Sequence, residues 1–288
     1  MAGFDSELPS VPSESGTSSV TTRVHSTATE SPVSPTSPST PRVSFILATL
    51  NERQNLPVVI DRIRQESLPP FEVVVIDDGS TDGTREYVTQ LAASDPRFRP
   101  IFHDGKQTTL RAQCQAIGSA TGEFVVVMDS DLQHPPSVVP QMIHELDHGA
   151  ALVVASRYAP GGSPGRRSAG RILLSRGAEG AAKLLLRDAR GLSDPVSGFF
   201  AFRRAIFQPV NPLYRGYKLL LFVLVMSHGH RVAEVPFQFV PRATGSSKVT
   251  QGFGFIPAFL VEVLLAKRLE ATISRRSKSF GAVPKPSE

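Results

Sequence analysis

One stretch of sequence decides the fold: Glu123-Phe-Val-Val-Val-Met-Asp-Ser-Asp-Leu-Gln-His-Pro-Pro136. Its apolar half, with three consecutive valines, is typical of a strand that is buried on both faces, as in a parallel sheet. The polarity then changes abruptly at Asp129, Ser130 and Asp131. In open α/β sheets the ligand crevice lies at the carboxyl ends of the strands, and we expect this acidic segment there.

Two carboxylates one residue apart repel each other unless a cation lies between them. Oxygen ligands favour a hard ion such as Mg2+ or Mn2+, and such an ion can also hold substrate phosphates. The pair Asp129 and Asp131 therefore predicts a divalent metal site at the end of the strand. An acidic surface turn without a metal is the alternative interpretation of an isolated Asp-x-Asp.

Strands and helices alternate along the chain as far as Ser156. Between two valine-rich segments, Leu56, Val59 and Ile63 recur at helical spacing. This alternation favours a doubly wound, mostly parallel α/β sheet with flanking helices. The expected strands are 43–50, 71–76, 98–103, 124–128 and 151–156, and the expected helices are one that Asn51 can cap, one that ends near Ser94, 108–120 and 136–148.

The second half of the chain is less regular. We expect a turn that enters a strand at 194–203 and an alternating strand at 231–240. The expected helices are 171–186, which is basic and amphipathic, 217–227, which is strongly apolar, and 253–269, which Glu262 interrupts and a basic tail follows.

Three regions differ in composition. Residues 1–42 are rich in Ser, Thr and Pro, so they cannot bury enough apolar surface to offset their ordering entropy, and we expect a disordered tail. Residues 43–250 are expected to form the α/β domain. Residues 251–288 are expected to form an amphipathic helix and its basic tail.

The composition is that of a globular chain, with 40% hydrophobic and 20% charged residues among 288. A formal net charge of +5 favours an anionic partner such as nucleic acid, nucleotide phosphates or lipid headgroups. Cys114 is the only cysteine, which excludes an intrachain disulfide and a cysteine-built metal site. Signal-peptide features and an apolar run of roughly 18 residues are both missing, so we expect an intracellular chain that does not span a membrane.

Three motifs resemble those of glycosyltransferase family 2, whose members have the GT-A fold. They are Leu50-Asn-Glu-Arg-Gln-Asn-Leu-Pro57, Val75-Ile-Asp-Asp-Gly-Ser-Thr-Asp-Gly-Thr84 and Met128-Asp-Ser-Asp-Leu-Gln-His-Pro-Pro136. Further segments at 156–158, 175–178, 216–218 and 242–248 are similar to the dolichol-phosphate (polyprenol-phosphate) mannose synthase branch. The resemblance covers residues 43–250 and implies a GT-A domain with a less regular acceptor side.

The resemblance and the residue chemistry together predict a donor site. We expect a divalent ion, held by Asp129, Asp131 and Gln133, to stabilise the charge that develops on a leaving diphosphate. Glu52 and Asp78 follow neighbouring strands, where carboxylates can accept hydrogen bonds from a ribose or base; helix capping and turn formation are the alternatives. The predicted nucleotide-sugar contacts are Ala48, Leu50, Glu52, Ile76, Asp78, Asp129, Ser130, Asp131, Arg157, Arg242 and Lys248.

Cations are expected on the phosphates, because the guanidinium fork suits bidentate phosphate contacts and lysine acts as a point charge. Arg157, Arg242 and Lys248 match motif positions of the family, and Arg171 is placed through its spacing from the segment 175–178. Arg171 and Arg242 are predicted on the acceptor phosphate. Asp131, Arg157 and Arg242 are the predicted catalytic residues, and a solvated surface position is the alternative for each cation.

The resemblance implies inverting, metal-dependent transfer of mannose from GDP-mannose to a dolichyl or polyprenyl phosphate. Such an acceptor is already a phosphate monoester, so positioning and charge neutralisation suffice without a dedicated general base. One alternative is transfer of glucose or another hexose from a UDP- or GDP-sugar by the same fold. A second is a non-catalytic basic binding protein, but the Lys and Arg are scattered and no base-stacking aromatic pattern indicates nucleic acid.

Two segments suggest a membrane surface as a partner. Residues 171–186 and 253–269 combine apolar and basic side chains, as helices that lie in the membrane interface do. We therefore expect peripheral attachment to the cytoplasmic face of a membrane, with core helices packed on the sheet as the alternative. The resemblance also implies a membrane-embedded partner subunit, because relatives in this branch carry spanning helices or rely on membrane subunits.

Overall fold

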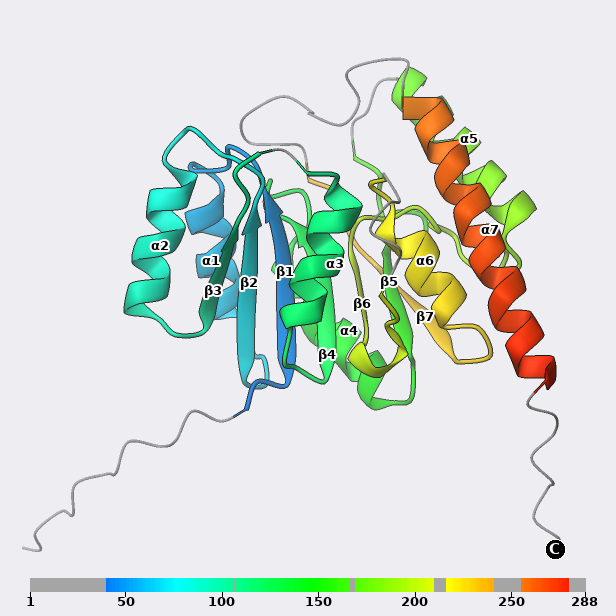
Figure 1. Ribbon diagram of the computed structural model, residues 1–288, viewed down its shortest axis with the longest axis horizontal. Helices are drawn as coiled ribbons and strands as arrows, with labels where there is room; N and C mark the ends of the chain where they lie inside the picture. Colours follow the sequence, from blue (N-terminus) through cyan, green and yellow to red (C-terminus); the bar gives the residue numbers. More distant parts are fainter. Residues whose placement is uncertain (1–39, 106, 166–168, 210–215, 241–254, 280–288) are drawn as a thin grey trace, which may run out of the picture. The chain divides into compact units, whose positions relative to one another are not determined.

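The computed structural model describes residues 40–105, 107–165, 169–209, 216–240 and 255–279 (Figure 1). Of the predicted disordered tail, residues 1–39 lie outside the described residues, and so do Arg242 and Lys248. Arg171 lies in a described helix, but its side chain is outside the description.

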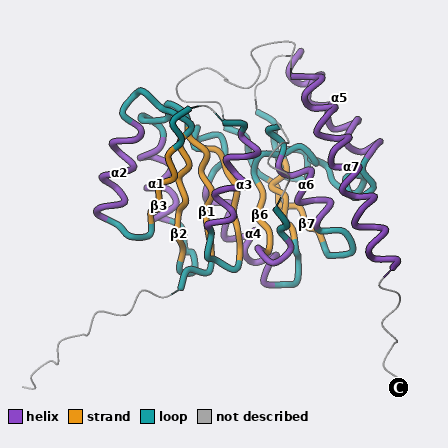
Figure 2. The backbone as a smooth tube through the Cα atoms, viewed as in Figure 1, coloured by secondary structure: helices purple, strands orange, loops and turns teal. Residues whose placement is uncertain are grey.

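A seven-stranded sheet with the order β3-β2-β1-β4-β6-β5-β7 forms the centre of the fold (Figure 2). Only β6 runs antiparallel to its neighbours, β4 and β5, and the other described pairs are parallel. The predicted mostly parallel α/β sheet is therefore confirmed. The strands are β1 (Val43–Thr49), β2 (Phe71–Asp77), β3 (Phe98–Phe102), β4 (Phe124–Asp129), β5 (Leu152–Ser156), β6 (Phe200–Arg203) and β7 (Val232–Pro236).

Helices cover both faces of the sheet and create two apolar cores. In β4, Val125 and Val127 face one core while Val126 and Met128 face the other, so the valine-rich strand is buried on both sides as predicted. The first core is closed by α3 (Thr109–Ser119), α5 (Ala169–Leu185), α6 (Leu219–Met226) and α7 (Phe255–Ser279), and the second by α1 (Leu56–Gln65), α2 (Thr84–Ser94), the 3-10 turn η1 (Pro136–Val138) and α4 (Val139–Asp147).

Three element boundaries differ clearly from the expectation, and one of them is the end of β7, which lies at Pro236 instead of residue 240. Helix α1 begins at Leu56 with Asn55 at its N-cap position, so the prediction that Asn51 caps this helix is wrong. Helix α7 continues to Ser279, through part of the predicted basic tail. The reason is that the first glycine or proline after Pro257 is Gly281, so nothing in the sequence between them ends the helix.

A buried carboxylate joins β1, β2 and the α3–β4 connection. Glu72 is 4% exposed and accepts hydrogen bonds from Ser44 Oγ at 2.7 Å, Thr121 N at 2.6 Å and Arg99 Nη1 at 2.8 Å. Burial alone would raise the pKa of this carboxyl, but these hydrogen bonds outweigh it and lower the pKa below its usual value. Glu72 is therefore ionised in the folded protein.

Replacing Glu72 with alanine is expected to lower the free energy of unfolding by about 2 kcal/mol, because the buried Ser44 hydroxyl loses its acceptor and so do the less buried donors of Thr121 and Arg99. Since the folded pKa is lowered, the stability from ionised Glu72 is present above the usual value of 4.5 and is lost as the pH falls through the folded pKa. Urea unfolding should show a smaller difference between the two proteins at pH 3 than at pH 7. The exposed Glu86 of α2, replaced in the same way, is the control, and an equal effect there would contradict this role.

Candidate active site

The carboxyl ends of β1, β2 and β4 form the floor of the candidate site, at the upper edge of the sheet in Figure 1. Ala48 of β1 lies in register with Ile76 on one side and with Asp129 on the other. Ser130 Oγ donates to the carbonyl oxygen of Ala48 at 3.0 Å. Three predicted nucleotide-contacting positions therefore lie in one row across three neighbouring strands, and a fourth, Ser130, is hydrogen-bonded to that row.

The loops that follow β1 and β2 are joined to each other beside this row. Asn51, with a positive φ of 53°, receives Thr81 N–H on its Oδ1 at 2.8 Å and donates its own N–H to Ser80 Oγ at 2.7 Å. Asn51 thus connects two loops rather than capping a helix. The two connected loops carry the predicted residues Glu52 and Asp78 to the same edge, next to Leu50.

Glu52 and Asp78 differ in their surroundings. Glu52 Oε2 accepts from Asn55 Nδ2 at 2.7 Å, which is the helix-start chemistry that was the alternative for this residue. Asp78 Oδ1 lies 2.8 Å from His103 Nδ1, and His103 Nε2 lies 2.8 Å from Gln115 Oε1. His103, which follows β3, and Gln115 of α3 therefore orient the carboxylate of Asp78, which follows β2.

The turn after β2 is built by Asp77, one residue earlier. Its carboxylate is fully buried and accepts the backbone N–H groups of Gly79 at 3.1 Å and Ser80 at 3.0 Å, as well as Arg85 Nε at 2.7 Å. Burial would raise the pKa of Asp77, but the hydrogen bonds from Ser80, Arg85 and Gly79 lower it overall. Asp77 is thus a structural anion that shapes the loop carrying Asp78.

The acidic segment at the end of β4 carries two carboxylates that differ in exposure. The carboxylate of Asp129 is 49% exposed at the end of the strand, whereas Asp131 is only 3% exposed and its Oδ1 accepts the N–H of Gln133 at 3.1 Å. Leu132 has a positive φ of 66°, which turns the chain between Asp131 and Gln133. Gln133 donates its Nε2 to the carbonyl of Val240 at 3.4 Å.

These residues fit a hard divalent ion. Across the described part of the chain, no three His, Cys, Asp or Glu side chains are grouped as a metal site. Mg2+, however, is commonly held by one or two carboxylates, with water and substrate phosphate oxygens completing the shell. Two carboxylates and the Gln133 amide, all from one short loop, are a donor set of that kind.

The neutral side chain of His134 packs beneath this loop and hydrogen-bonds to its backbone. Its Nδ1 accepts the backbone N–H of Asp129 at 3.0 Å, and its ring stacks on Phe199 with a centroid distance of 5.1 Å. Burial, with help from the charges of Arg157 and Lys218, lowers the pKa of His134 to about 4. The imidazole is therefore neutral near pH 7, and it fixes the backbone at Asp129 without adding charge.

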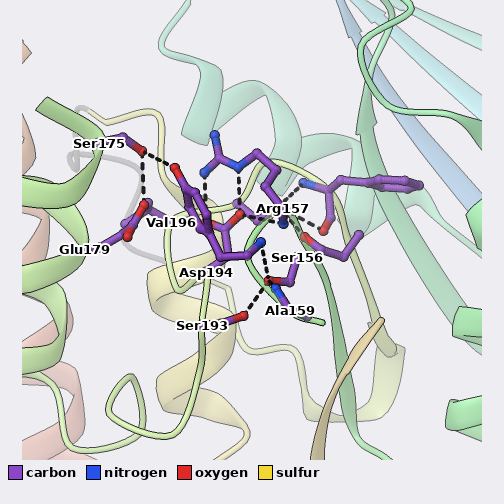
Figure 3. A network of polar contacts seen from close by, with 12 residues as sticks. Ser156, Arg157, Ala159, Ser175, Glu179, Ser193, Asp194 and Val196 are labelled. Carbon is purple, nitrogen blue, oxygen red and sulfur yellow. Dashed lines mark hydrogen bonds and ion pairs between the residues drawn. The ribbon is translucent and has the colours of Figure 1, made fainter. Parts of the chain in front are cut away.

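Arg157 follows β5 and is paired with a buried acid, Asp194, which is not among the predicted site residues. Arg157 Nε lies 2.7 Å from Asp194 Oδ2 and Nη2 lies 2.8 Å from Oδ1, which is a bidentate contact (Figure 3). Asp194 is fully buried and also accepts the N–H of Arg157 at 3.2 Å. Because Asp194 engages Nε and one N–H of Nη2, a phosphate contact by Arg157 would have to use Nη1 or the second N–H of Nη2, and this contact stays a prediction.

Lys218, at the N-terminus of α6, is a cation that is missing from the predicted site residues. Its Nζ donates to the carbonyl of Val196 at 2.8 Å, close enough to Arg157, Asp194 and Asp129 that their charges act on it. Burial, followed by the charge of Arg157, lowers the pKa of this ammonium group. The sequence signal for Lys218 is the segment 216–218, which is similar to the mannose synthase branch.

A second layer of polar groups holds the Arg157–Asp194 pair (Figure 3). Ser193 Oγ lies 2.5 Å from Ser156 Oγ, and the N–H groups of Ser193 and Asp194 both donate to the Glu234 carboxylate of β7.

Most of the predicted site residues lie at the carboxyl edge of the sheet. They are Ala48, Leu50, Glu52, Ile76, Asp78, Asp129, Ser130, Asp131, Gln133 and Arg157. The predicted phosphate contacts of Arg171, Arg242 and Lys248 depend on side chains outside the described residues.

Solved structures with the same arrangement of elements are glycosyltransferases. Glucosyl-3-phosphoglycerate synthase from Mycobacterium tuberculosis, in complex with Mn2+, UDP-glucose and phosphoglyceric acid, aligns with a TM-score of 0.59 over 79% of each chain at 21% identity. Its complex with UDP aligns with a TM-score of 0.58 over 80% of each chain. At this identity the likeness shows the fold alone, and that fold is GT-A.

Sequence comparison then gives the family. Residues 44–210 match Glycosyl transferase family 2. The chain is 33% identical over 220 residues to polyprenol monophosphomannose synthase of Mycolicibacterium smegmatis, covering 73% of this chain and 82% of that protein. It is 38% identical over 212 residues to dolichol-phosphate mannosyltransferase of Pyrococcus furiosus, covering 72% of this chain but 59% of the relative's length. The chain belongs to glycosyl transferase family 2 and is a glycosyltransferase.

Proposed function

We propose that this protein transfers mannose from GDP-mannose to a dolichyl or polyprenyl phosphate, with inversion and with a bound Mg2+ or Mn2+. The observation that carries the proposal is the row formed by Ile76, Ala48 and Asp129, which ends in the Asp129–Asp131 loop beside the cations Arg157 and Lys218. The names of the relatives, a dolichol-phosphate mannosyltransferase and a polyprenol monophosphomannose synthase, support the choice of sugar and acceptor.

Acidic and basic residues of the site have different proposed roles. A divalent ion held by Asp129, Asp131 and Gln133 would supply Lewis-acid stabilisation of the leaving diphosphate. Arg157 and Lys218 add fixed positive charge at the same edge, where negative charge increases as the glycosidic bond breaks. The acceptor phosphate brings its own anionic oxygen, so the site needs to orient it and has no proton to remove from it.

Transfer from radiolabelled sugar nucleotides to a short polyprenyl phosphate tests this function. We expect label from GDP-mannose to enter the lipid in the presence of Mn2+ or Mg2+, and a chelator to stop the transfer. Label from UDP-glucose or GDP-glucose in its place would favour the alternative hexosyltransferase. Absence of transfer together with salt-sensitive binding to DNA would favour a non-catalytic basic protein.

We also propose that the enzyme works at the cytoplasmic face of a membrane, attached through α7. None of the described helices is both long and apolar enough to cross a bilayer. One side of α7 is nevertheless apolar and outward-facing, with Leu260 43% and Leu264 53% exposed. A hollow of about 440 Å3 opens between α5 and α7, and its lining is Gly170, Leu174, Gly177, Ala178, Ala181, Ile256, Phe259 and Leu260.

Apolar surface of this kind supports contact with acyl chains, and the isoprenyl chain of an acceptor has the same chemistry. The other side of α7 belongs to the core, because Phe259 and Val263 are buried against the helices around it. Deleting α7 would therefore remove part of the core, so point substitutions are the better test. A membrane-embedded partner subunit is a further proposal for the same surface.

Replacing both Leu260 and Leu264 with aspartate is expected to abolish binding to anionic vesicles at low salt, because charges on that face oppose insertion. Cosedimentation of the full chain with vesicles measures this binding. Val58 of α1 is 40% exposed on the opposite side of the sheet, and Val58→Asp serves as the matched control that keeps binding. A wild-type protein that stays in the supernatant would contradict direct attachment and leave the partner subunit as the proposal.

A further inference from the structure

The inner side of α7 carries a buried carboxylate. Glu262 is fully buried, although Val261 and Leu264 on the same helix are exposed. Its Oε1 accepts the backbone N–H groups of Tyr217 and of Lys218, the latter at 3.1 Å. Lys218 is the N-cap residue of α6 and makes no capping hydrogen bond with its own side chain. Glu262 therefore fixes the start of α6 from a helix that begins 37 residues after Lys218.

Gly216 makes this approach of the carboxylate possible. A Cβ atom at position 216 would lie 1.8 Å from Glu262 Oε1, so any other residue would push the carboxylate away. On its other side, the carbonyl of Gly216 accepts the N–H of Leu110, in the first turn of α3, at 3.0 Å. The segment 216–218 is thus held between α3 and α7, and its position is closely defined.

Packing alone does not account for a carboxylate at this position. Within the described part of the chain, Glu262 Oε2 is buried and has no hydrogen-bond partner. Burial raises the pKa of Glu262 to about 7, against the opposing effect of the N–H groups and the Lys218 charge. Tyr217 and Lys218 are the titratable groups that face it from the neighbouring segment. A buried charge with so few partners lowers stability, and such costs are commonly found at functional sites.

We propose that Glu262 is a positioning residue for Lys218. By holding the backbone at Tyr217 and Lys218, it sets the point from which the lysine side chain reaches the carbonyl of Val196 beside the Arg157–Asp194 pair. The inference rests on the proposed function in one respect, that Lys218 lies at the nucleotide-sugar site. It also means that the helix whose outer side is proposed to meet the membrane determines the geometry of the donor site.

A double-mutant cycle between Glu262 and Lys218 tests the proposal. Glu262→Leu removes the acceptor and should lower kcat/KM for transfer at least tenfold, as should Lys218→Met. The double variant should be no worse than Lys218→Met alone, because Glu262 acts through Lys218. The same non-additivity should appear in the Kd for GDP with Mn2+, measured by calorimetry. Losses that multiply in the double variant, or an unchanged kcat/KM in Glu262→Leu, would overturn the proposal.

Glu262→Gln keeps an oxygen towards the two N–H groups and removes the buried charge. We expect this variant to lose only a few-fold in kcat/KM and to have a Tm at pH 8 that is no lower than that of the wild type. If Glu262→Leu does not fold, Glu262→Gln replaces it in the double-mutant cycle with Lys218→Met. The matched control is Glu270→Gln, since Glu270 is a buried α7 carboxylate that accepts Arg187 N–H at 2.8 Å and pairs with Lys267. This control should lower the Tm and leave kcat/KM within twofold. If Glu270→Gln lowers kcat/KM as much as Glu262→Gln does, the positioning role is overturned.

The two proposals fail in different ways. A wild-type protein that binds GDP with Mn2+ and shows non-additive Kd values, yet makes no mannosyl lipid, would refute the proposed function and support the role of Glu262. A wild-type protein that makes mannosyl lipid, with additive losses in the cycle, would support the function and refute the role of Glu262.

Discussion

Replacing Asp131 with asparagine is expected to lower glycosyl transfer about a thousand-fold, corresponding to ~4 kcal/mol of lost transition-state stabilisation. Asparagine keeps the shape of the side chain and still offers an oxygen to the N–H of Gln133, which lies 3.1 Å from Asp131 Oδ1. What it removes is one negative charge from a buried position that we propose as a metal ligand. Initial rates with GDP-mannose and polyprenyl phosphate over a range of Mn2+ concentrations measure the loss.

The fold should survive this change, because a buried charge is replaced by a neutral group of equal size. Circular dichroism and the Tm check that point. Asp95→Asn is the control: Asp95 lies after α2, paired with Arg64 at 2.9 Å and Arg97 at 2.8 Å, and it should leave transfer unchanged. An Asp131→Asn enzyme with activity within a few-fold of the wild type and the same metal dependence would remove Asp131 from the metal site.

The sheet and the floor of the site could be predicted because their signals are local. A valine-rich strand that ends in Asp129 is read from a few consecutive residues, and parallel strands bring their carboxyl ends to one edge. The register then follows from the sheet, which places Ala48 between Ile76 and Asp129.

The partners of the cations could not be predicted in the same way. Asp194 lies 37 residues after Arg157, in a turn whose sequence indicates only a change of direction. Glu262 lies 44 residues after Lys218 and interrupts an apolar helix, where a sequence pattern cannot tell an outward-facing acid from a buried one. Antiparallel β6 inserts between β4 and β5, and it is the loop before β6 that carries Asp194 to the edge. Contacts between residues of distant loops leave no periodic pattern in the sequence from which they could be predicted.

Replacing Asp194 with alanine is expected to lower the free energy of unfolding by about 3–5 kcal/mol, because it leaves the Arg157 guanidinium buried without its counter-charge. Arg157 is 8% exposed and loses contacts of 2.7 and 2.8 Å at once. For a domain of this size the Tm should fall on the order of 10 °C. Asp188→Ala breaks the less buried contact of Asp188 with His228, 2.9 Å long, and should cost less.

A double variant separates the stability of this pair from its function. Arg157→Met together with Asp194→Leu replaces both charges with apolar side chains, and buried pairs replaced in this way often regain stability. We expect the unfolding free energy of the double variant to return most of the way to that of the wild type, while transfer stays at least a hundred-fold lower because the cation at the donor edge is gone. Urea unfolding and initial rates on the same preparations measure both quantities. If transfer recovers together with stability, the Arg157–Asp194 pair is only a structural bridge between the ends of β5 and the loop before β6, and positive charge at the donor site must come from Lys218 and other residues.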